Sequence, residues 1–72
     1  MVNQKTPLQK QIQEFCRKAR GDMKQKTWGQ KIGLSLTSVH NFEHGESYPS
    51  LTKLELMAKC VGKKVVITFE DL

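Results

Sequence analysis

Two short helical patterns that meet at a glycine constrain the fold of this chain more than any other feature. The first pattern covers residues 25–32 and stops at Gly33, where glycine readily adopts the positive φ that a sharp turn needs. The second pattern follows Ser35, whose side chain can cap a helix, and stops at Gly45. We therefore predict two short helices joined by a tight turn, the layout of a helix-turn-helix unit.

The residues of this unit predict how its two helices pack. Gly29 lies inside the first helix, where glycine costs about 1 kcal/mol relative to alanine. We expect the missing side chain to let the helices cross closely, which would offset that cost. The apolar positions are spaced to fill the wedge between the helices: Trp28, Ile32, Leu34, Val39 and Phe42.

Helices are also expected on both sides of this unit. Thr6 and Pro7 suit the start of a helix, and Gly21 suits its end. The apolar side of that helix carries Leu8, Ile12, Phe15, Cys16 and Ala19. Asp22 and Gln25 are three residues apart, a capping-box spacing that predicts the start of the next helix.

A last helix is predicted after Ser50, and Gly62 would end it. Its inner side carries Leu51, Leu54, Ala58 and Val61. We therefore predict an all-α fold of four to five helices, with a helical core over residues 5–62 and a single domain over residues 1–72. A chain of this size buries only about 60–65% of its unfolded surface, so we expect marginal stability for a monomer.

The C-terminal residues 64–69 follow a different pattern. After the lysine they are β-branched or aromatic without interruption, which predicts a strand: Val65, Val66, Ile67, Thr68 and Phe69. The chain offers no second strand candidate, and a lone strand leaves a row of N–H and C=O groups unpaired. We expect an antiparallel two-stranded ribbon with the same strand of another copy, in a homodimer. In an alternative interpretation, the strand adds to the sheet edge of a partner protein.

Charge is distributed unevenly along the chain. Residues 1–31 hold eight basic and two acidic residues, whereas residues 32–72 hold four basic and five acidic residues. A basic half suggests a polyanionic partner, nucleic acid before a membrane surface. A lysine-rich face that only aids solubility is the plainer alternative. Because the sequence has no apolar run long enough to span a bilayer and no signal-peptide pattern, we expect a cytoplasmic protein without a membrane partner.

The chain offers little to metal or catalytic chemistry. Cys16 and Cys60 fall inside apolar helical patterns without zinc-like spacing, so we interpret both as reduced core thiols. His40 and His44 are spaced as in a helical metal pair, but only two ligands are visible. No Ser/His/Asp or paired-carboxylate arrangement stands out. We therefore expect no metal, no cofactor and no enzymatic activity.

The outward face of the helix after Ser35 is short-chained and polar, a composition that suits DNA base edges. Asparagine binds adenine through two hydrogen bonds, threonine and serine bond several base edges, and an apolar methyl meets a thymine methyl. The candidate base contacts are Leu36, Thr37, Ser38, His40 and Asn41. Since the face has no Arg or Lys, we expect a site rich in A·T pairs. Phosphate contacts are expected from Lys24, Gln25, Lys26 and Lys31.

Residues 23–62 resemble, without a gap, the Cro/repressor family of phage and bacterial helix-turn-helix proteins. Gln25 matches the glutamine that opens the family's second helix. The turn and the helix after it match at Gly33, Ser35, Val39, Phe42, Glu43 and Gly45. The fourth helix matches at Pro49, Ser50, Leu51, Ala58 and Gly62. The resemblance implies a lambda-repressor-like arrangement of the helices.

The resemblance also implies a function and residue roles. It implies a transcriptional regulator, a repressor, that binds double-stranded DNA as a dimer on an inverted repeat. Base contacts would come chiefly from Leu36, Thr37 and Asn41, and phosphate contacts from Gln25, Ser35 and His44. Glu43 would form a structural ion pair with a basic residue of the first helix, Arg17 or Lys18.

Two other functions stay open at this point. One is an antitoxin-type interaction module whose strand at residues 64–69 binds a partner toxin. The other is an RNA binder. This alternative is weaker, because the sequence lacks the aromatic platform on which single-stranded RNA bases stack.

Overall fold

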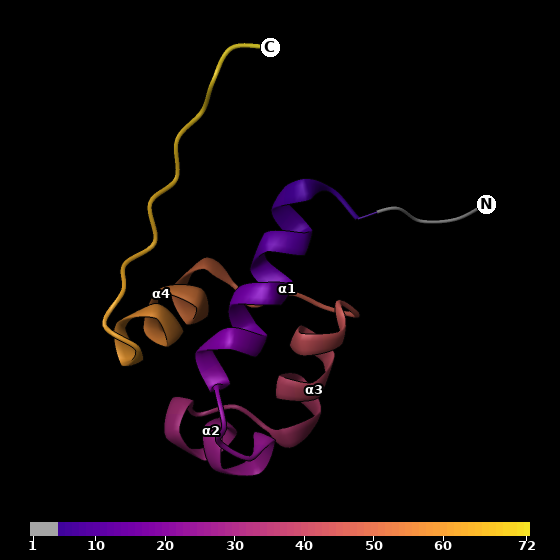
Figure 1. Cartoon of the computed structure of the whole chain (residues 1–72), viewed down its shortest axis with the longest axis vertical. Helices are drawn as coiled ribbons and strands as arrows, with labels where there is room; N and C mark the ends of the chain where they lie inside the picture. Colours follow the sequence, from indigo (N-terminus) through magenta and orange to yellow (C-terminus); the bar gives the residue numbers. More distant parts are fainter. Residues whose placement is uncertain (1–4) are drawn as a thin grey trace, which may run out of the picture.

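The computed structural model of the protein describes residues 5–72, and these form four α-helices with no strand among them. The helices are α1 (Pro7–Arg20), α2 (Gln25–Ile32), α3 (Leu36–His44) and α4 (Leu51–Cys60). In Figure 1, α1 crosses the middle of the molecule, α2 lies at its lower end, and α3 and α4 lie to either side. The predicted all-α fold is confirmed. Within the described residues, no helix has the length and apolar character needed to cross a bilayer.

The core forms where the α2–α3 pair meets α1 and α4. Trp28, Ile32 and Val39 are at most 2% exposed, as the wedge prediction required. Leu34 and Phe42 pack against them and are partly buried. The other helices complete the buried core with Cys16, Met57 and Ala58.

The close crossing of α2 and α3 depends on two glycines. A Cβ atom added to Gly29 would lie 2.6 Å from the Leu34 carbonyl oxygen and 3.2 Å from Val39 Cγ2. The first distance is too short for any real side chain, so the prediction of a close approach is confirmed. Gly33 adopts a φ of 73°, and the following N–H, that of Leu34, donates back to the Gly29 carbonyl at 2.8 Å.

Side-chain caps begin three of the helices. Thr6 and Gln9 form a full capping box at α1, with backbone-to-side-chain bonds of 2.9 and 3.1 Å. Ser35 and Ser50 cap α3 and α4 by accepting from N–H groups three residues on, at 3.1 and 3.2 Å. The predicted caps at Thr6, Ser35 and Ser50 are confirmed.

The capping box predicted for α2 is wrong. Because α2 begins at Gln25, Lys24 holds the N-cap position, and its side chain makes no capping hydrogen bond. Asp22 lies two residues before that position, out of register with the free N–H groups of the first turn. The start of α2 therefore presents backbone N–H groups that its N-cap side chain does not occupy.

The inner side of α4 also differs from the prediction. Ala58 is buried as expected, but Met57 is buried with it, and Leu51 is 54% exposed. Leu51 lies two turns before Ala58, at an end of α4 that borders an open groove. The end of the helix is as predicted: Gly62 follows the C-cap residue Val61 with a φ of 73°, and its N–H donates to the Lys59 carbonyl at 3.1 Å.

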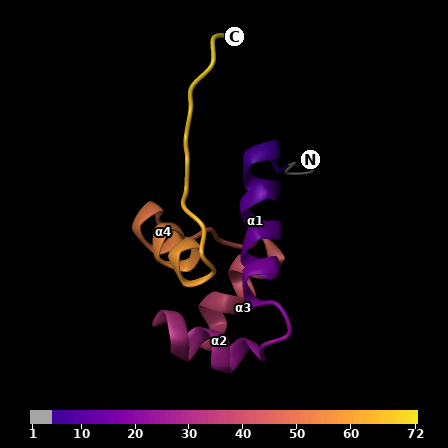
Figure 2. The ribbon, with the colours of Figure 1, turned by 60° about the vertical axis from the view of Figure 1, so that its left-hand side comes forward.

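Residues 63–71 form a C-terminal arm that leaves α4 and runs away from the helices (Figures 1 and 2). In the single chain the arm is not part of a sheet. Val66, Ile67 and Phe69 are 71%, 58% and 96% exposed. The strand expected at residues 64–69 stays a prediction, since its expected partner is another molecule.

Candidate nucleic-acid interface

The outward face of α3 is open to solvent. Leu36 is 53% exposed, Thr37, His40 and His44 are exposed, and Asn41 is half-buried. The opposite side of the helix faces the core. The structure therefore brings most of the residues predicted for base contacts onto one accessible surface.

Ser35 and Ser38 are tied together at the start of α3. The Ser35 hydroxyl accepts from the Ser38 N–H at 3.1 Å and donates to the Ser38 hydroxyl at 3.0 Å. Both hydrogen-bonding functions of the Ser35 side chain are thus used within the helix cap. Ser38 is half-buried and keeps its own hydroxyl hydrogen for a further acceptor.

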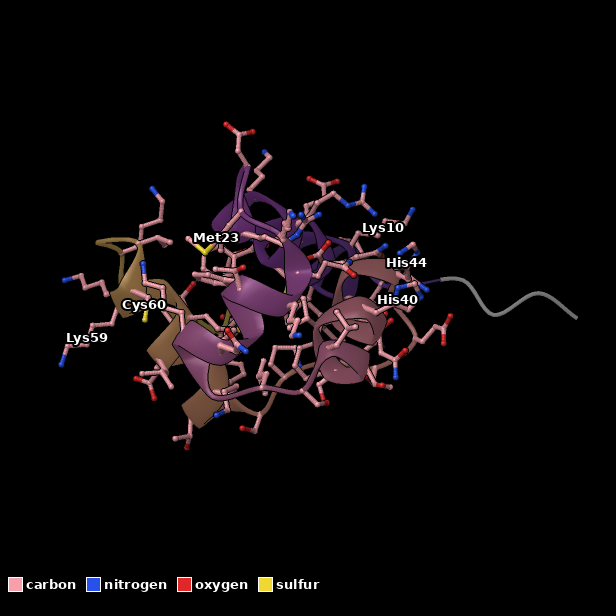
Figure 3. The ribbon with its side chains drawn as sticks, turned by 90° about the horizontal axis from the view of Figure 1, so that it is seen from below. Lys10, Met23, His40, His44, Lys59 and Cys60 are labelled. Carbon is pink, nitrogen blue, oxygen red and sulfur yellow. The ribbon has the colours of Figure 1, made fainter. Side chains whose placement is uncertain are left out.

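His40 and His44 form a stacked pair on the exposed face. Their ring centroids lie 4.0 Å apart with an interplanar angle of 28°, and both project from α3 at the edge of the molecule (Figure 3). Within residues 5–72, no group of three or more His, Cys, Asp or Glu side chains could hold a metal ion. What the pair offers on this surface is imidazole N–H donors, which suit phosphate oxygens and base acceptors.

The predicted phosphate contacts on α2 differ in their surroundings. Lys24 and Lys26 are exposed at the start of the helix, next to its uncapped N–H groups. This combination of N–H groups and positive charge favours an anion. Lys31 is exposed at the other end, with its Nζ 6.0 Å from the ring centroid of Trp28, a cation–π distance.

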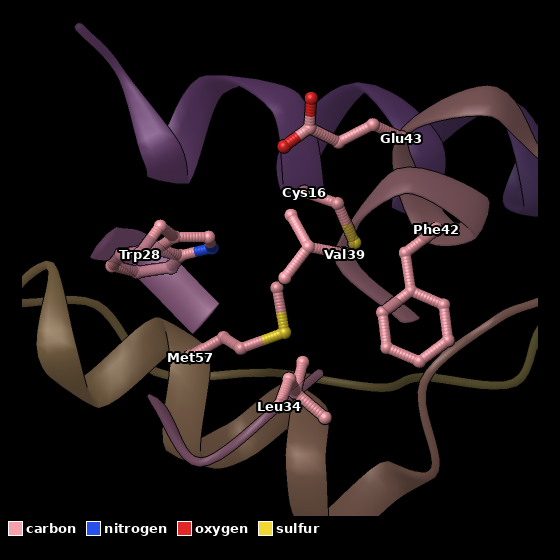
Figure 4. Close-up of a pocket in the computed structure, with 7 residues that line it drawn as sticks. All are labelled: Cys16, Trp28, Leu34, Val39, Phe42, Glu43 and Met57. Carbon is pink, nitrogen blue, oxygen red and sulfur yellow. The ribbon is translucent and has the colours of Figure 1, made fainter. Parts of the chain in front are cut away.

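A buried carboxylate, that of Glu43, joins α3 to α1 and α2. Glu43 is 3% exposed. In Figure 4 its carboxylate lies near the α1 ribbon, above the core side chains of Cys16 and Val39. Its two carboxylate oxygens accept from Arg20 at 2.7 and 3.0 Å, and one of them also accepts from the Gln25 amide at 3.2 Å. The side chain of Gln25 therefore has a structural partner, in addition to its predicted phosphate contact.

The ion pair predicted between Glu43 and Arg17 or Lys18 is wrong, because Arg20 is the partner. All three basic residues lie in the last turn of α1, but it is the guanidinium of Arg20 that reaches the carboxylate. Arg17 instead donates to the backbone carbonyl of Glu43 at 2.9 Å. Lys18 is exposed.

Two residues of this network, Gln13 and Arg20, were not predicted from the sequence, and they share one side of α1 with Arg17. Gln13 donates to the Glu43 carbonyl at 3.0 Å, and Arg20 also donates to the Met23 carbonyl at 2.7 Å. Gln13, Arg17 and Arg20 follow each other at spacings of four and three, the period of one helix face. That polar stripe was the signal in the sequence. It holds α3 in place through hydrogen bonds from one side.

Burial also suppresses the chemistry of the Cys16 thiol. Burial, together with the nearby charge of Glu43, raises the pKa of Cys16 to about 11. A thiol with such a pKa stays protonated and unreactive at neutral pH. Cys16 and Cys60 are both free thiols, as predicted, although Cys60 is only partly buried.

Comparisons with models of protein families, with curated proteins and with solved structures find no match to this chain. The site must therefore be interpreted from its own geometry. It consists of a neutral polar helix face, a helix start flanked by lysines, and a buried network that fixes the two helices on α1. The polar side chains of α3 can donate hydrogen bonds to acceptor atoms of a ligand, and the lysines at the start of α2 can bind anionic groups beside them.

Proposed function

We propose that this protein binds double-stranded DNA in a sequence-specific manner and represses transcription, with the lambda-repressor-like arrangement of the Cro/repressor family. The single observation that carries the proposal is the exposed polar face of α3. That helix is held against α2 by the close approach at Gly29, and against α1 by the hydrogen bonds of Glu43. A rigid helix with an unobstructed polar face is what reading a DNA groove requires.

Base and phosphate contacts divide between the two helices in this proposal. An α-helix with its side chains is about 10–12 Å wide, which fits a major groove about 12 Å wide. In the groove, Asn41 pairs with adenine, and Leu36 or Thr37 meets a thymine methyl. Lys24 and Lys26 hold the phosphates beside the start of α2.

Selection of bound sites from random duplex DNA tests this function. We expect enrichment of A·T-rich half-sites in an inverted repeat, with centres about 10 base pairs apart. Affinity for the selected site, measured by fluorescence anisotropy, should fall steeply with salt, because bound phosphates release counterions. Binding without enrichment of any sequence, or no binding to duplex DNA, would contradict the proposal.

We propose further that the protein acts as a homodimer held by a ribbon of residues 64–69. One α3 reads few base pairs, so a second copy on an inverted repeat supplies the missing specificity. Support comes from an apolar groove of about 910 Å³ between α1, α4 and the C-terminal arm, lined in part by Leu8, Phe15, Leu51 and Leu54. A second copy suits this groove, because the arm that forms one wall has an unpaired main-chain edge that an identical arm can complete.

Sedimentation of a chain that ends at Gly62 tests the dimer. We expect the full chain to be dimeric and the shortened chain to be monomeric. Circular dichroism should show the same helical content in the four helices of both chains. A shortened chain as dimeric as the full chain would overturn the ribbon. A monomeric full chain would instead favour the antitoxin alternative, in which the strand adds to the sheet of another protein.

A further inference from the structure

The C-terminal arm carries opposite charges at its two ends. Lys63 and Lys64 begin it, Glu70 and Asp71 end it, and the five residues between them are uncharged. All four charged residues are exposed, and the ion pair found within residues 5–72 does not involve them. An antiparallel strand of the same sequence therefore meets each charged end with the opposite charge.

We propose that the arm pairs with the arm of a second copy in one register, with Ile67 opposite the partner's Ile67. This inference rests on the proposed dimer and specifies how its two chains meet. In this register Lys64 lies opposite the partner's Glu70, and Lys63 lies opposite the partner's Asp71. The two-fold axis repeats both pairs, so oppositely charged residues face each other at both ends of the ribbon.

Other pairings of the arm lose this match. A parallel ribbon sets lysines beside lysines and carboxylates beside carboxylates, and like charges directly opposite each other are unfavourable. An axis at Val66 puts Lys64 opposite the partner's Thr68, and an axis at Thr68 puts Glu70 opposite the partner's Val66. Only the axis at Ile67 gives all four charged residues of the arm an oppositely charged neighbour.

The same register keeps the apolar side chains together. Side chains alternate between the two faces of a strand, and directly opposite residues point to the same face. The arm lines the groove with the whole run from Val65 to Phe69, and Val65 is its half-buried member. The register places Val65 opposite the partner's Phe69 on one side of the ribbon, around Ile67, and Lys64 opposite the partner's Glu70 on the other side.

The groove supplies what a ribbon of two strands lacks by itself. A two-stranded ribbon is marginally stable in water unless it packs on other elements. Leu8 and Leu51 at the groove are 64% and 54% exposed, and Phe69 is 96% exposed. A ribbon laid on the groove through its apolar side covers all three, so the two apolar surfaces complete each other.

Charge-swapped chains test the register. The first variant combines Lys63→Glu with Lys64→Glu, and the second combines Glu70→Lys with Asp71→Lys. Each variant alone has like charges at both ends of its ribbon, so its dimer dissociation constant should rise at least tenfold. A one-to-one mixture should form the heterodimer with near wild-type affinity, measured by sedimentation or native mass spectrometry. Lys59→Glu, an exposed change on α4 outside the arm, should leave dimerisation unchanged.

Cysteine cross-linking tests the axis independently, in chains that also carry Cys60→Ser. Directly opposite residues have Cα atoms about 4.5–5.5 Å apart, within the range of a disulfide. Ile67→Cys should therefore give a disulfide-linked dimer under mild oxidation. Val66→Cys and Thr68→Cys should not, because the two copies of either residue lie about 8 Å apart in this register.

The outcomes separate the register from the proposals on which it rests. If the wild-type chain is monomeric, the dimer and the register both fail, whereas DNA binding is judged by the site selection alone. If the wild-type chain is dimeric but the charge-swapped chains each dimerise equally well, the register alone is overturned. Cross-linking at Val66→Cys or Thr68→Cys in preference to Ile67→Cys would also overturn it. Weak separate dimers, a strong heterodimer and cross-linking at residue 67 support it.

Discussion

The α2–α3 pair and the C-terminal arm are both rich in apolar residues, but only the pair covers them within one chain. Trp28, Ile32 and Val39 are at most 2% exposed, whereas Val66 and Phe69 in the arm are 71% and 96% exposed. The helices also satisfy most of their main-chain groups internally, and the arm does not pair its edge with any strand of residues 5–72. One chain buries the apolar side chains of the first region and leaves those of the arm exposed.

If the protein forms the proposed dimer, this difference separates the residues that stabilise the single chain from those that join two chains. The hydrophobic effect favours removing both sets of apolar side chains from water. Substitutions in the α2–α3 pair should therefore change the free energy of unfolding of a single chain. Substitutions in the arm should change association and leave the folding of the single chain almost untouched.

The largest expected effect is that of Arg20→Ala. The change leaves the Glu43 carboxylate buried without its cation, so the free energy of unfolding should fall by about 3–5 kcal/mol. Urea unfolding followed by the fluorescence of Trp28, the single tryptophan, measures it. Lys18→Ala is the matched control and should change stability by less than about 0.5 kcal/mol. Equal losses for the two variants would contradict the ion pair with Arg20.

Gly29→Ala should have the next largest effect. Alanine is the better helix former by about 1 kcal/mol, but its Cβ would lie 2.6 Å from the Leu34 carbonyl oxygen. We expect a net loss of about 2 kcal/mol in the free energy of unfolding, in the range of overpacked cores. Gln30→Ala, an exposed change in the same helix, serves as the control. A Gly29→Ala chain as stable as the wild type would show that the two helices can separate at no cost.

Asn41→Ala should affect DNA recognition rather than stability. We expect a loss of about 1–3 kcal/mol on the selected site and little change on random DNA. Lys31→Ala should instead weaken binding to all sequences and reduce the salt slope by about one unit. Anisotropy titrations at several salt concentrations distinguish the two. An equal loss on both DNAs for Asn41→Ala would rule out its base contact.

The smallest effect on folding is expected for Phe69→Ala in the arm. At protein concentrations too low for a dimer, its free energy of unfolding should match the wild type within about 0.5 kcal/mol. At higher concentrations the wild type should gain stability from association, and the variant should gain less. A large loss at low concentration would show that the arm belongs to the fold of the single chain.

The sequence predicted the parts of this fold that depend on neighbours along the chain. Ser35 and Ser50 cap their helices because a hydroxyl reaches an N–H three residues on, whatever the rest of the molecule does. Trp28 and Val39 were expected in the core because helical spacing puts them on apolar faces. The exposed position of Leu36 on α3 followed from the same spacing.

The errors fall where distance in space replaces distance along the chain. Arg17, Lys18 and Arg20 all lie in the last turn of α1, and spacing alone did not show which of them faces Glu43. Leu51 has the correct spacing for an inner position on α4, but the neighbouring helix does not cover that end. Neither result follows from a local rule.

The sequence by itself determined the helical class of the fold, most of the helix ends, and the polar side that α3 turns away from the core. Caps, glycine turns and apolar periodicity act over a few residues, so they operate before the chain is compact. Only the tertiary structure decided that Arg20 neutralises Glu43 and that an open groove lies between α1, α4 and the arm. Both depend on how the helices cross, and that crossing is set by packing between residues far apart in the chain.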